Sequence, residues 1–237
     1  MKVELANLKE DISSSFKIEN DLSKLSEIFE KDKNISILKR KLDTSILDAA
    51  EYILKEKSQL HFSKIVHPQD IEKKLNSIFG SNIKTSPLFR DIARVVDIFC
   101  SLFSVKNVWL RLDAIEGPMC PRFHVDNLKC RLVSTYLGPG TEWLPNHLVN
   151  RHKLGHGNNG ELDEKSGLFP ENANIEQLDI GDLGLLKGEN WDRNQGNGLV
   201  HRSPQKDSDY KRLYMTIDFV DLYLRINRNP LNRLFLD

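Results

Sequence analysis

Hydrophobic residues recur every three or four positions through much of the first hundred residues. This is the period of an amphipathic helix, whose buried face repeats every 3.6 residues. Ser86 and Pro87 are typical cap and first-turn residues, and they mark the start of the most apolar of these segments. The stretch ISILKRKL is a candidate short strand among them. The periodicity predicts helices over residues 21–32, 44–57, 68–80 and 86–103.

After residue 106 the pattern changes to a two-residue alternation. NVWLRLDAI and KCRLVSTYL alternate and are rich in β-branched and aromatic residues, which favours strands. LGLLKG, GLVHRS and KRLYMTIDFV are further strand candidates, separated by Gly, Pro, Asn and Asp clusters. Helices followed by strands predict an α+β protein with a sandwich- or barrel-like sheet core. We expect a mainly helical support region over residues 1–105 and a sheet core over 106–237, in one compact unit.

The last predicted strand, KRLYMTIDFV, has two very different faces. One face is apolar and is expected to pack on the helices; its residues are Leu213, Met215, Ile217 and Phe219. The other face is too polar for a closed core; its residues are Arg212, Tyr214, Thr216 and Asp218. Since alternate residues of a strand point to opposite sides of the sheet, this pattern predicts a barrel with a polar interior that holds a charged ligand.

Composition excludes several classes of protein. Lys plus Arg and Asp plus Glu balance at 34 − 34 = 0, so no basic surface favours nucleic acid or an anionic membrane. The first residues lack the apolar segment of a secretory signal, and no run of eighteen apolar residues occurs. We therefore expect a soluble cytoplasmic protein without a nucleic-acid or membrane partner. The three cysteines form no CxxC pair, which argues against a disulfide framework and a thiolate zinc site.

The stretch CPRFHVDNLKC places His124 and Asp126 two residues apart. On a strand these side chains share one face and can reach one metal ion. His201, on a later predicted strand, is the candidate third ligand. Two histidines and one carboxylate form the facial triad that leaves coordination positions open and suits non-haem Fe(II). The alternative is a core histidine at 124, a turn cap at 126 and a histidine at 201 bonded to a backbone carbonyl. Cys120 or Cys130 as a ligand is a further alternative to their being small buried hydrophobes.

Arg212 follows His201 by eleven residues, with the turn residues PQKDSDY between them. This spacing predicts a hairpin that returns the chain antiparallel beside the histidine. With an even loop, Arg212 would face the same cavity, where a guanidinium suits a carboxylate ligand. The alternative is a structural ion pair of Arg212 with Asp209 or Asp218.

Residues 144–180 form the one long irregular stretch of the sequence, and they include His147, His152 and His156. A stretch of this length is usually functional or mobile. The histidines are five and four residues apart, and no carboxylate or thiol lies nearby at a spacing that would complete a metal site. We therefore favour a polar lid or surface loop over a second metal site.

The HVD sequence ending at Asp126, the late His201 and Arg212 together resemble the Fe(II)/2-oxoglutarate-dependent dioxygenases. CRLVSTYLGPGTEWLPN and VHRSP resemble an uncharacterised bacterial family, domain-of-unknown-function 1826. The resemblance implies a double-stranded β-helix, or cupin-like jelly-roll, core packed by the helical N-terminal part. It implies that His124, Asp126 and His201 are the catalytic and metal-binding residues. It also implies that Arg212 and Tyr214 bind the cosubstrate 2-oxoglutarate, although many relatives carry Ser or Thr at the position of Tyr214.

The resemblance implies an Fe(II)- and 2-oxoglutarate-dependent oxygenase of the hydroxylase type, acting on a small molecule or a protein side chain. The alternative is a cupin-like metal-binding protein without oxygenase activity, linked to zinc homeostasis. Zinc is also a substitute metal for the same ligands, because Zn²⁺ accepts His and carboxylate groups readily.

Overall fold

The computed structural model describes residues 23–80, 82–205 and 210–221. Its helices are α2 (Thr44–Glu56), α3 (Ile71–Phe79) and α4 (Ser86–Phe103). Short 3₁₀ turns are η1 (Ser26–Phe29), η2 (Asn146–Leu148), η3 (Arg151–Lys153) and η4 (Gly155–Asn158). The strands are β1 (Ile35–Leu38), β2 (His61–Val66), β3 (Val108–Glu116), β4 (Cys130–Leu137), β5 (Glu142–Trp143), β6 (Glu176–Gln177), β7 (Leu183–Lys187), β8 (His201–Arg202) and β9 (Lys211–Phe219). The last three predicted helices, the candidate strand in ISILKRKL and the five strands predicted after residue 106 are confirmed. The first predicted helix, residues 21–32, is confirmed only over residues 23–29, which end in η1; residues 30–32 form a turn, and residues 21–22 lie outside the described part.

The strands form two antiparallel sheets. The larger has the order β1-β7-β4-β9-β3-β2 and the smaller the order β6-β5-β8. The combination of helices with antiparallel sheet confirms the α+β prediction. Strands β1 and β2 come from the N-terminal region and join strands from the C-terminal region in the larger sheet, while the boundary predicted at residue 105 stays a prediction. Strand β2 was not predicted from the sequence.

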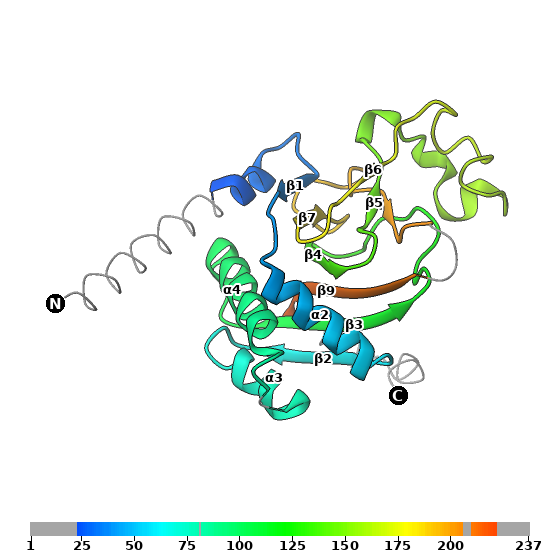
Figure 1. Ribbon diagram of the computed structural model, residues 1–237. Coiled ribbons are helices and arrows are strands. Elements are labelled where there is room, and N and C mark those ends of the chain that lie inside the picture. Colours follow the sequence, from blue (N-terminus) through cyan, green and yellow to red (C-terminus); the bar gives the residue numbers. More distant parts are fainter. Residues whose placement is uncertain (1–22, 81, 206–209, 222–237) are drawn as a thin grey trace, which may run out of the picture.

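A hydrophobic core fills the space between the helices and one face of the larger sheet. The helices α2, α3 and α4 lie together against this sheet, with β5 and β6 beyond it (Figure 1). The apolar face of β9 takes part as predicted, since Leu213, Met215 and Ile217 are fully buried in this core. Phe219 completes the face and packs on the rings of Phe99 and Phe103 from α4.

The opposite face of the larger sheet points toward the smaller sheet and is polar around β3 and β9, whereas at β1 and β7 it carries a small hydrophobic cluster. Directly paired residues form rows across the strands, for example Thr135, Tyr214 and Asp113 from β4, β9 and β3. Because buried polar groups are costly unless they find partners, such a face indicates a site rather than a packing surface. The polar side of β9 therefore lines an interior cavity, as its alternation predicts.

The predicted hairpin between His201 and Arg212 is wrong. Strand β8 pairs with β5 in the smaller sheet, whereas β9 lies between β4 and β3 in the larger one. The chain crosses from one sheet to the other between these strands, so sequence proximity does not make them neighbours. They approach across the interior instead, with both side chains lining one cavity.

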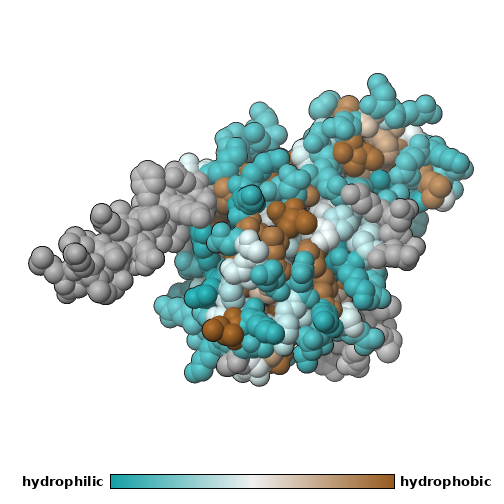
Figure 2. Space-filling view, in the orientation of Figure 1, coloured by the Kyte–Doolittle hydropathy of each residue, from teal (hydrophilic) through white to brown (hydrophobic). Residues whose placement is uncertain are grey.

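The surface is mostly hydrophilic, with hydrophobic side chains gathered in a few patches on the face that Figure 2 shows. One exposed hydrophobic residue, Met119, lies at the rim of the interior cavity. In the described part of the chain, we find no helix with the length and apolar character needed to span a bilayer.

Candidate metal centre

Backbone pairing brings His124 and His201 together. The amide of each residue donates to the carbonyl oxygen of the other, and both N···O distances are 3.0 Å. Residues directly opposite each other in an antiparallel pair project side chains to the same face. The two imidazole rings accordingly lie 4.6 Å apart between their centroids. The pair links the HVD segment to strand β8 although the residues are far apart in sequence.

Asp126 completes a group of three ligand-type side chains. Its Oδ1 lies 3.9 Å from Nε2 of His124, and its Oδ2 lies 3.6 Å from Nε2 of His201. Metals bind such atoms at about 2.1 Å, so two ligands of one ion lie no more than about 4.2 Å apart. Both separations meet this limit, each through a different oxygen of Asp126. With one ligand atom taken from each residue, the three atoms lie within 4.8 Å of one another, so small side-chain shifts would bring them onto one transition-metal ion.

Within the described ranges no second group of three or more His, Cys, Asp or Glu side chains is placed to share an ion. His147, His152 and His156 lie in η2, η3 and η4 and form no such group. Cys130 is buried, and Cys120 is exposed at the cavity without joining the three ligands. The side chains of His147, His152 and His156 are all exposed, as expected for a surface loop.

Hydrogen bonds to backbone carbonyl oxygens orient both imidazoles. Nδ1 of His124 lies 2.9 Å from the carbonyl oxygen of Arg122, and Nδ1 of His201 lies 3.1 Å from that of Leu199. A proton on each Nδ1 makes these hydrogen bonds and leaves the Nε2 lone pairs facing Asp126, the usual orientation of metal-binding histidines. Burial is the main cause that lowers the pKa of His201 to about 4. This ring is therefore neutral near pH 7 and ready to bind a cation.

Arg131 of strand β4 holds the carboxylate of Asp126. Its Nη1 donates to Oδ2 of Asp126 over 2.8 Å. Burial works to raise the pKa of Asp126, but the charge of Arg131, joined at low pH by the two histidines once they are protonated, outweighs it and holds the pKa below its ordinary value. The carboxylate is thus ionised and available as a ligand at neutral pH.

Arg131 belongs to a buried ionic network that was not predicted from the sequence. Its guanidinium also donates to both oxygens of Asp218, over 2.8 and 3.2 Å. Arg111 donates to the same carboxylate over 2.8 Å and to Oγ1 of Thr216 over 3.0 Å. The one sequence signal was the arginine at an inward position of KCRLVSTYL, which strand alternation assigns to the polar face.

Arg212 enters the same cavity without a carboxylate partner. Its side chain is 1% exposed and donates one hydrogen bond, from Nη2 to Oγ1 of Thr135 over 3.1 Å. The guanidinium stacks on the ring of Tyr214 at 4.5 Å, and its Nε finds no acceptor. Among the described residues no carboxylate pairs with Arg212; Asp218 pairs with other arginines, and Asp209 lies outside the described part. Burial lowers the pKa of this guanidinium.

Arg202, the residue after His201, is also buried at the cavity but is fully paired. It donates to Glu142 over 2.8 Å and to Glu164 over 2.7 Å, and its guanidinium lies 4.2 Å above the ring of Phe123. These carboxylates neutralise its charge. Arg212 is consequently the better candidate for binding a carboxylate ligand.

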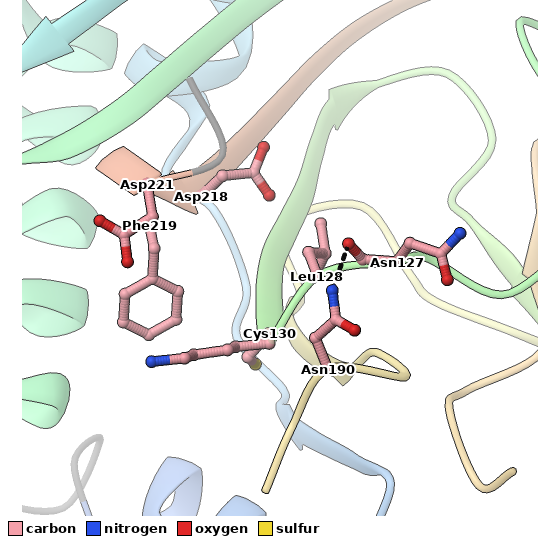
Figure 3. Close-up of a pocket in the computed structure, with 8 residues that line it drawn as sticks. Asn127, Leu128, Cys130, Asn190, Asp218, Phe219 and Asp221 are labelled. Carbon is pink, nitrogen blue, oxygen red and sulfur yellow. Dashed lines mark hydrogen bonds between the residues drawn. The ribbon is translucent and has the colours of Figure 1, made fainter. Parts of the chain in front are cut away.

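A second cavity of about 220 Å³ is lined by the segment that begins at Asn127, the residue after Asp126, and several of its residues are drawn in Figure 3. Its lining comes from the segment after Asp126, from the loop after β7 and from the end of β9, and includes Asn127, Asn190 and Phe219. The carboxylate of Asp218 turns away from the ring of Phe219 in Figure 3, as strand alternation requires. This second cavity contains no group of three metal-ligating side chains among the described residues.

Comparison with protein families gives one match, which covers most of the chain. The family described as "Protein of unknown function (DUF1826)" matches residues 19–218. The chain belongs to this family. The predicted membership of the DUF1826 family is thereby confirmed, and the match spans the N-terminal helices as well as the three candidate ligands.

Several solved structures are similar to the DUF1826 chain at low identity. A prolyl-4-hydroxylase from Pseudomonas putida is 10% identical, with a TM-score of 0.44 over 84% of this chain and 92% of that one. A full-length protein from Neurospora crassa, solved in complex with alpha-KG, is 10% identical, with a TM-score of 0.41 over 86% and 79%. HygX from Streptomyces hygroscopicus, with nickel and 2-oxoglutarate bound, is 11% identical, with a TM-score of 0.42 over 82% and 85%. No curated protein matches the chain.

Proposed function

We propose that this DUF1826 protein is an Fe(II)- and 2-oxoglutarate-dependent oxygenase of the hydroxylase type, acting on a small molecule or a protein side chain. The observation that supports it best is one cavity that combines two kinds of group. On one side lie His124 and His201, with Asp126 within 4 Å of both, and on another lies the buried guanidinium of Arg212, which has no carboxylate partner among the described residues. Metal ligation explains the first group, and a carboxylate ligand explains the second.

His124, Asp126 and His201 would hold the metal through one nitrogen or oxygen each. Fe(II) bound there supplies the redox chemistry with dioxygen and the 2-oxo acid. Three protein ligands leave further coordination positions for small ligands. The protein contributes orientation, through the carbonyl contacts of the two histidines, and a carboxylate kept ionised by Arg131.

Arg212 and Tyr214 would bind the distal carboxylate of 2-oxoglutarate. The guanidinium has a free Nε hydrogen, and the stacked ring of Tyr214 restricts where its plane points. A guanidinium that is buried without a counter-ion is costly, and a bound carboxylate would offset that cost. In this proposal the arginine is preorganised for an anion that the protein itself does not provide.

The charge balance of the cavity supports an anionic cosubstrate. Arg131 and Arg111 are matched by Asp126 and Asp218 through direct hydrogen bonds. Arg212 remains unmatched among the described residues, and a bound metal adds two further positive charges. A dianion such as 2-oxoglutarate restores near-neutrality, whereas a neutral ligand leaves the buried charges uncompensated.

The proposal includes the fold. In it, the two facing sheets form a double-stranded β-helix around this cavity.

The test is an anaerobic titration of metal-free protein with Fe(II) and then with 2-oxoglutarate. Chelation of Fe(II) by the 2-oxo acid end should produce a visible metal-to-ligand charge-transfer band with one equivalent of each component. Substitution Arg212→Met should shift its appearance to much higher 2-oxoglutarate concentration. Fe(II) binding without any such band would contradict the oxygenase proposal and favour a metal-binding protein without that activity. Metal content after purification would not serve, since zinc competes well for nitrogen ligands.

A further inference from the structure

We infer that Arg131 is a positioning residue that determines how Asp126 binds the metal. The inference rests on the proposed metal centre and concerns the residues that hold its ligands in place. A carboxylate can bind a cation through one oxygen or through both, and the choice changes the number of positions left for other ligands. Nη1 of Arg131 lies 2.8 Å from Oδ2 of Asp126, which commits one oxygen to a charge-assisted hydrogen bond.

Arg131 is itself fixed from the opposite side. In the sheet register it lies directly across from Asp218, and it donates to both oxygens of that carboxylate. Asp218 is 0% exposed and also accepts a hydrogen bond from Arg111. Arg131 and Asp218 are therefore both held in place. Neither can move with Asp126 if a metal ion draws both oxygens of Asp126 toward itself.

The support reaches across two more strands, β3 and β2. Arg111 lies over the ring of Trp109 at 4.6 Å, and Nε1 of Trp109 donates to Oγ of Ser63 in β2 over 2.8 Å. Cross-strand pairs of this kind stabilise the arrangement of side chains on one face of a sheet. Residues that hydrogen-bond to a metal ligand and hold it in place normally strengthen metal binding. Their loss typically weakens metal affinity by about 10- to 100-fold.

The geometry thus assigns Arg131 two effects on the centre. It keeps Asp126 bound through one oxygen, so that three positions of an octahedral ion stay open for ligands. It also fixes the position of that carboxylate, which preorganises Asp126 for the ion. A purely structural arginine would have neither effect on the metal.

The experiment compares Co²⁺ binding by the metal-free full chain in the parent and in Arg131→Met. Co²⁺ is a suitable probe because its visible ligand-field spectrum reports coordination number. Arg131→Met should bind Co²⁺ about 10- to 100-fold more weakly, and at saturating Co²⁺ its spectrum should differ from that of the parent. Arg131→Lys should keep the charge but should not restore the parent spectrum, since one ammonium cannot serve both carboxylates in the same geometry.

Arg40 provides a matched control. It makes a two-pronged ion pair with Asp91, over 2.6 and 2.9 Å, on the helix side of the same sheet. Arg40→Met should lower thermal stability without changing the Co²⁺ spectrum. If Arg131→Met is too unstable to study, Asp218→Asn weakens the anchor of Arg131 without touching Asp126, and the spectrum should change in the same direction.

The outcomes separate the two proposals. A parent protein that binds no Co²⁺ would contradict the metal centre itself. A parent that binds one equivalent, with Arg131 and Asp218 variants that match it in affinity and spectrum, would overturn the positioning role alone. An altered spectrum in the Arg40 variant would show a general effect of lost ion pairs and would equally overturn it.

Discussion

Replacement of Arg212 by methionine should have opposite effects on ligand binding and on the stability of the ligand-free protein. Methionine has no charge and is flexible, so it replaces the aliphatic stem of the arginine and removes only the guanidinium group. The native guanidinium is 1% exposed, has one hydrogen bond to Thr135 and leaves Nε without an acceptor. Methionine removes the group proposed to bind the carboxylate and also removes a buried charge without a counter-ion.

The magnitudes follow from these contacts. Loss of one partner of a buried charge pair costs about 2–5 kcal/mol, which is roughly thirty- to several-thousand-fold in the dissociation constant of 2-oxoglutarate. In the ligand-free protein, the unsatisfied Nε donor of Arg212 costs about 1–3 kcal/mol of stability, and the methionine variant regains that amount. The variant also loses the hydrogen bond to Thr135, which offsets part of the regained stability. We expect the unfolding temperature to stay the same or to rise by about 2–4 °C, which corresponds to about 1 kcal/mol for a chain of this size.

Two measurements on the same samples test this prediction. Calorimetric titration of 2-oxoglutarate into metal-loaded protein gives the affinity, and thermal unfolding of the metal-free protein gives the stability. Arg40→Met is the matched control, because it leaves the buried carboxylate of Asp91 unpaired and should cost about 3–5 kcal/mol. Parent-like affinity in Arg212→Met would refute the carboxylate role. Destabilisation as large as that of the Arg40 variant would show that Arg212 is a structural residue.

Three further predictions concern other parts of the site. A Cβ at Gly188 would lie 2.6 Å from the carbonyl oxygen of Asp126, so Gly188→Ala should destabilise the protein by about 1–3 kcal/mol and weaken Co²⁺ binding, as thermal unfolding and titration would show. Burial raises the pKa of Asp113 despite the charge of His61, so this acid's contribution to stability should fall as the pH rises above the ordinary value of about 4. Asp113→Asn should remove that part of the pH dependence of the unfolding free energy, and an unchanged pH profile would contradict it. Cys120 is exposed while the other two cysteines are buried, so mass spectrometry should find one alkylated thiol in the native protein and three after unfolding; labelling of all three in the native state would be the contrary result.

Local periodicity was sufficient to predict most helices and strands, because each depends on its own buried face. Residues 86–103 show this best, since a wide apolar face and a Ser-Pro start predict the bounds of α4 as they stand. Strand β2 was missed because it is an edge strand with Lys64 and His61 exposed, and only Phe62 and Val66 are buried. Lys64 falls on the same alternate positions as Phe62 and Val66 and interrupts the apolar pattern, as charged residues on edge strands often do.

The candidate site was predictable where it depends on spacing and not where it depends on register. The two-residue spacing of His124 and Asp126 brings them to one face, and the position of His201 on a later strand made it the natural third residue. Arg131, the partner of the Asp126 carboxylate, is only five residues away in the sequence. The guanidinium is held by Asp218, 87 residues further along the chain. Only the alignment of β4 with β9 brings that pair together, and no local pattern encodes it.

The wrong hairpin has the same origin. Short turn-rich connections usually join neighbouring antiparallel strands, which favoured a direct pairing of the strands that hold His201 and Arg212. Here the connection passes between two sheets, and each strand finds its partners elsewhere. Both side chains still reach one cavity, because the polar faces of the two sheets point toward each other.

Stoichiometric Co²⁺ titration of the parent and of single alanine variants tests the central claim most directly. If His124, Asp126 and His201 share one ion, the parent should bind one tight equivalent and each of the three variants should lose it. A variant with alanine at His147, His152 and His156 should bind as the parent does. One tight equivalent retained in His201→Ala, or lost in the triple variant, would contradict the account.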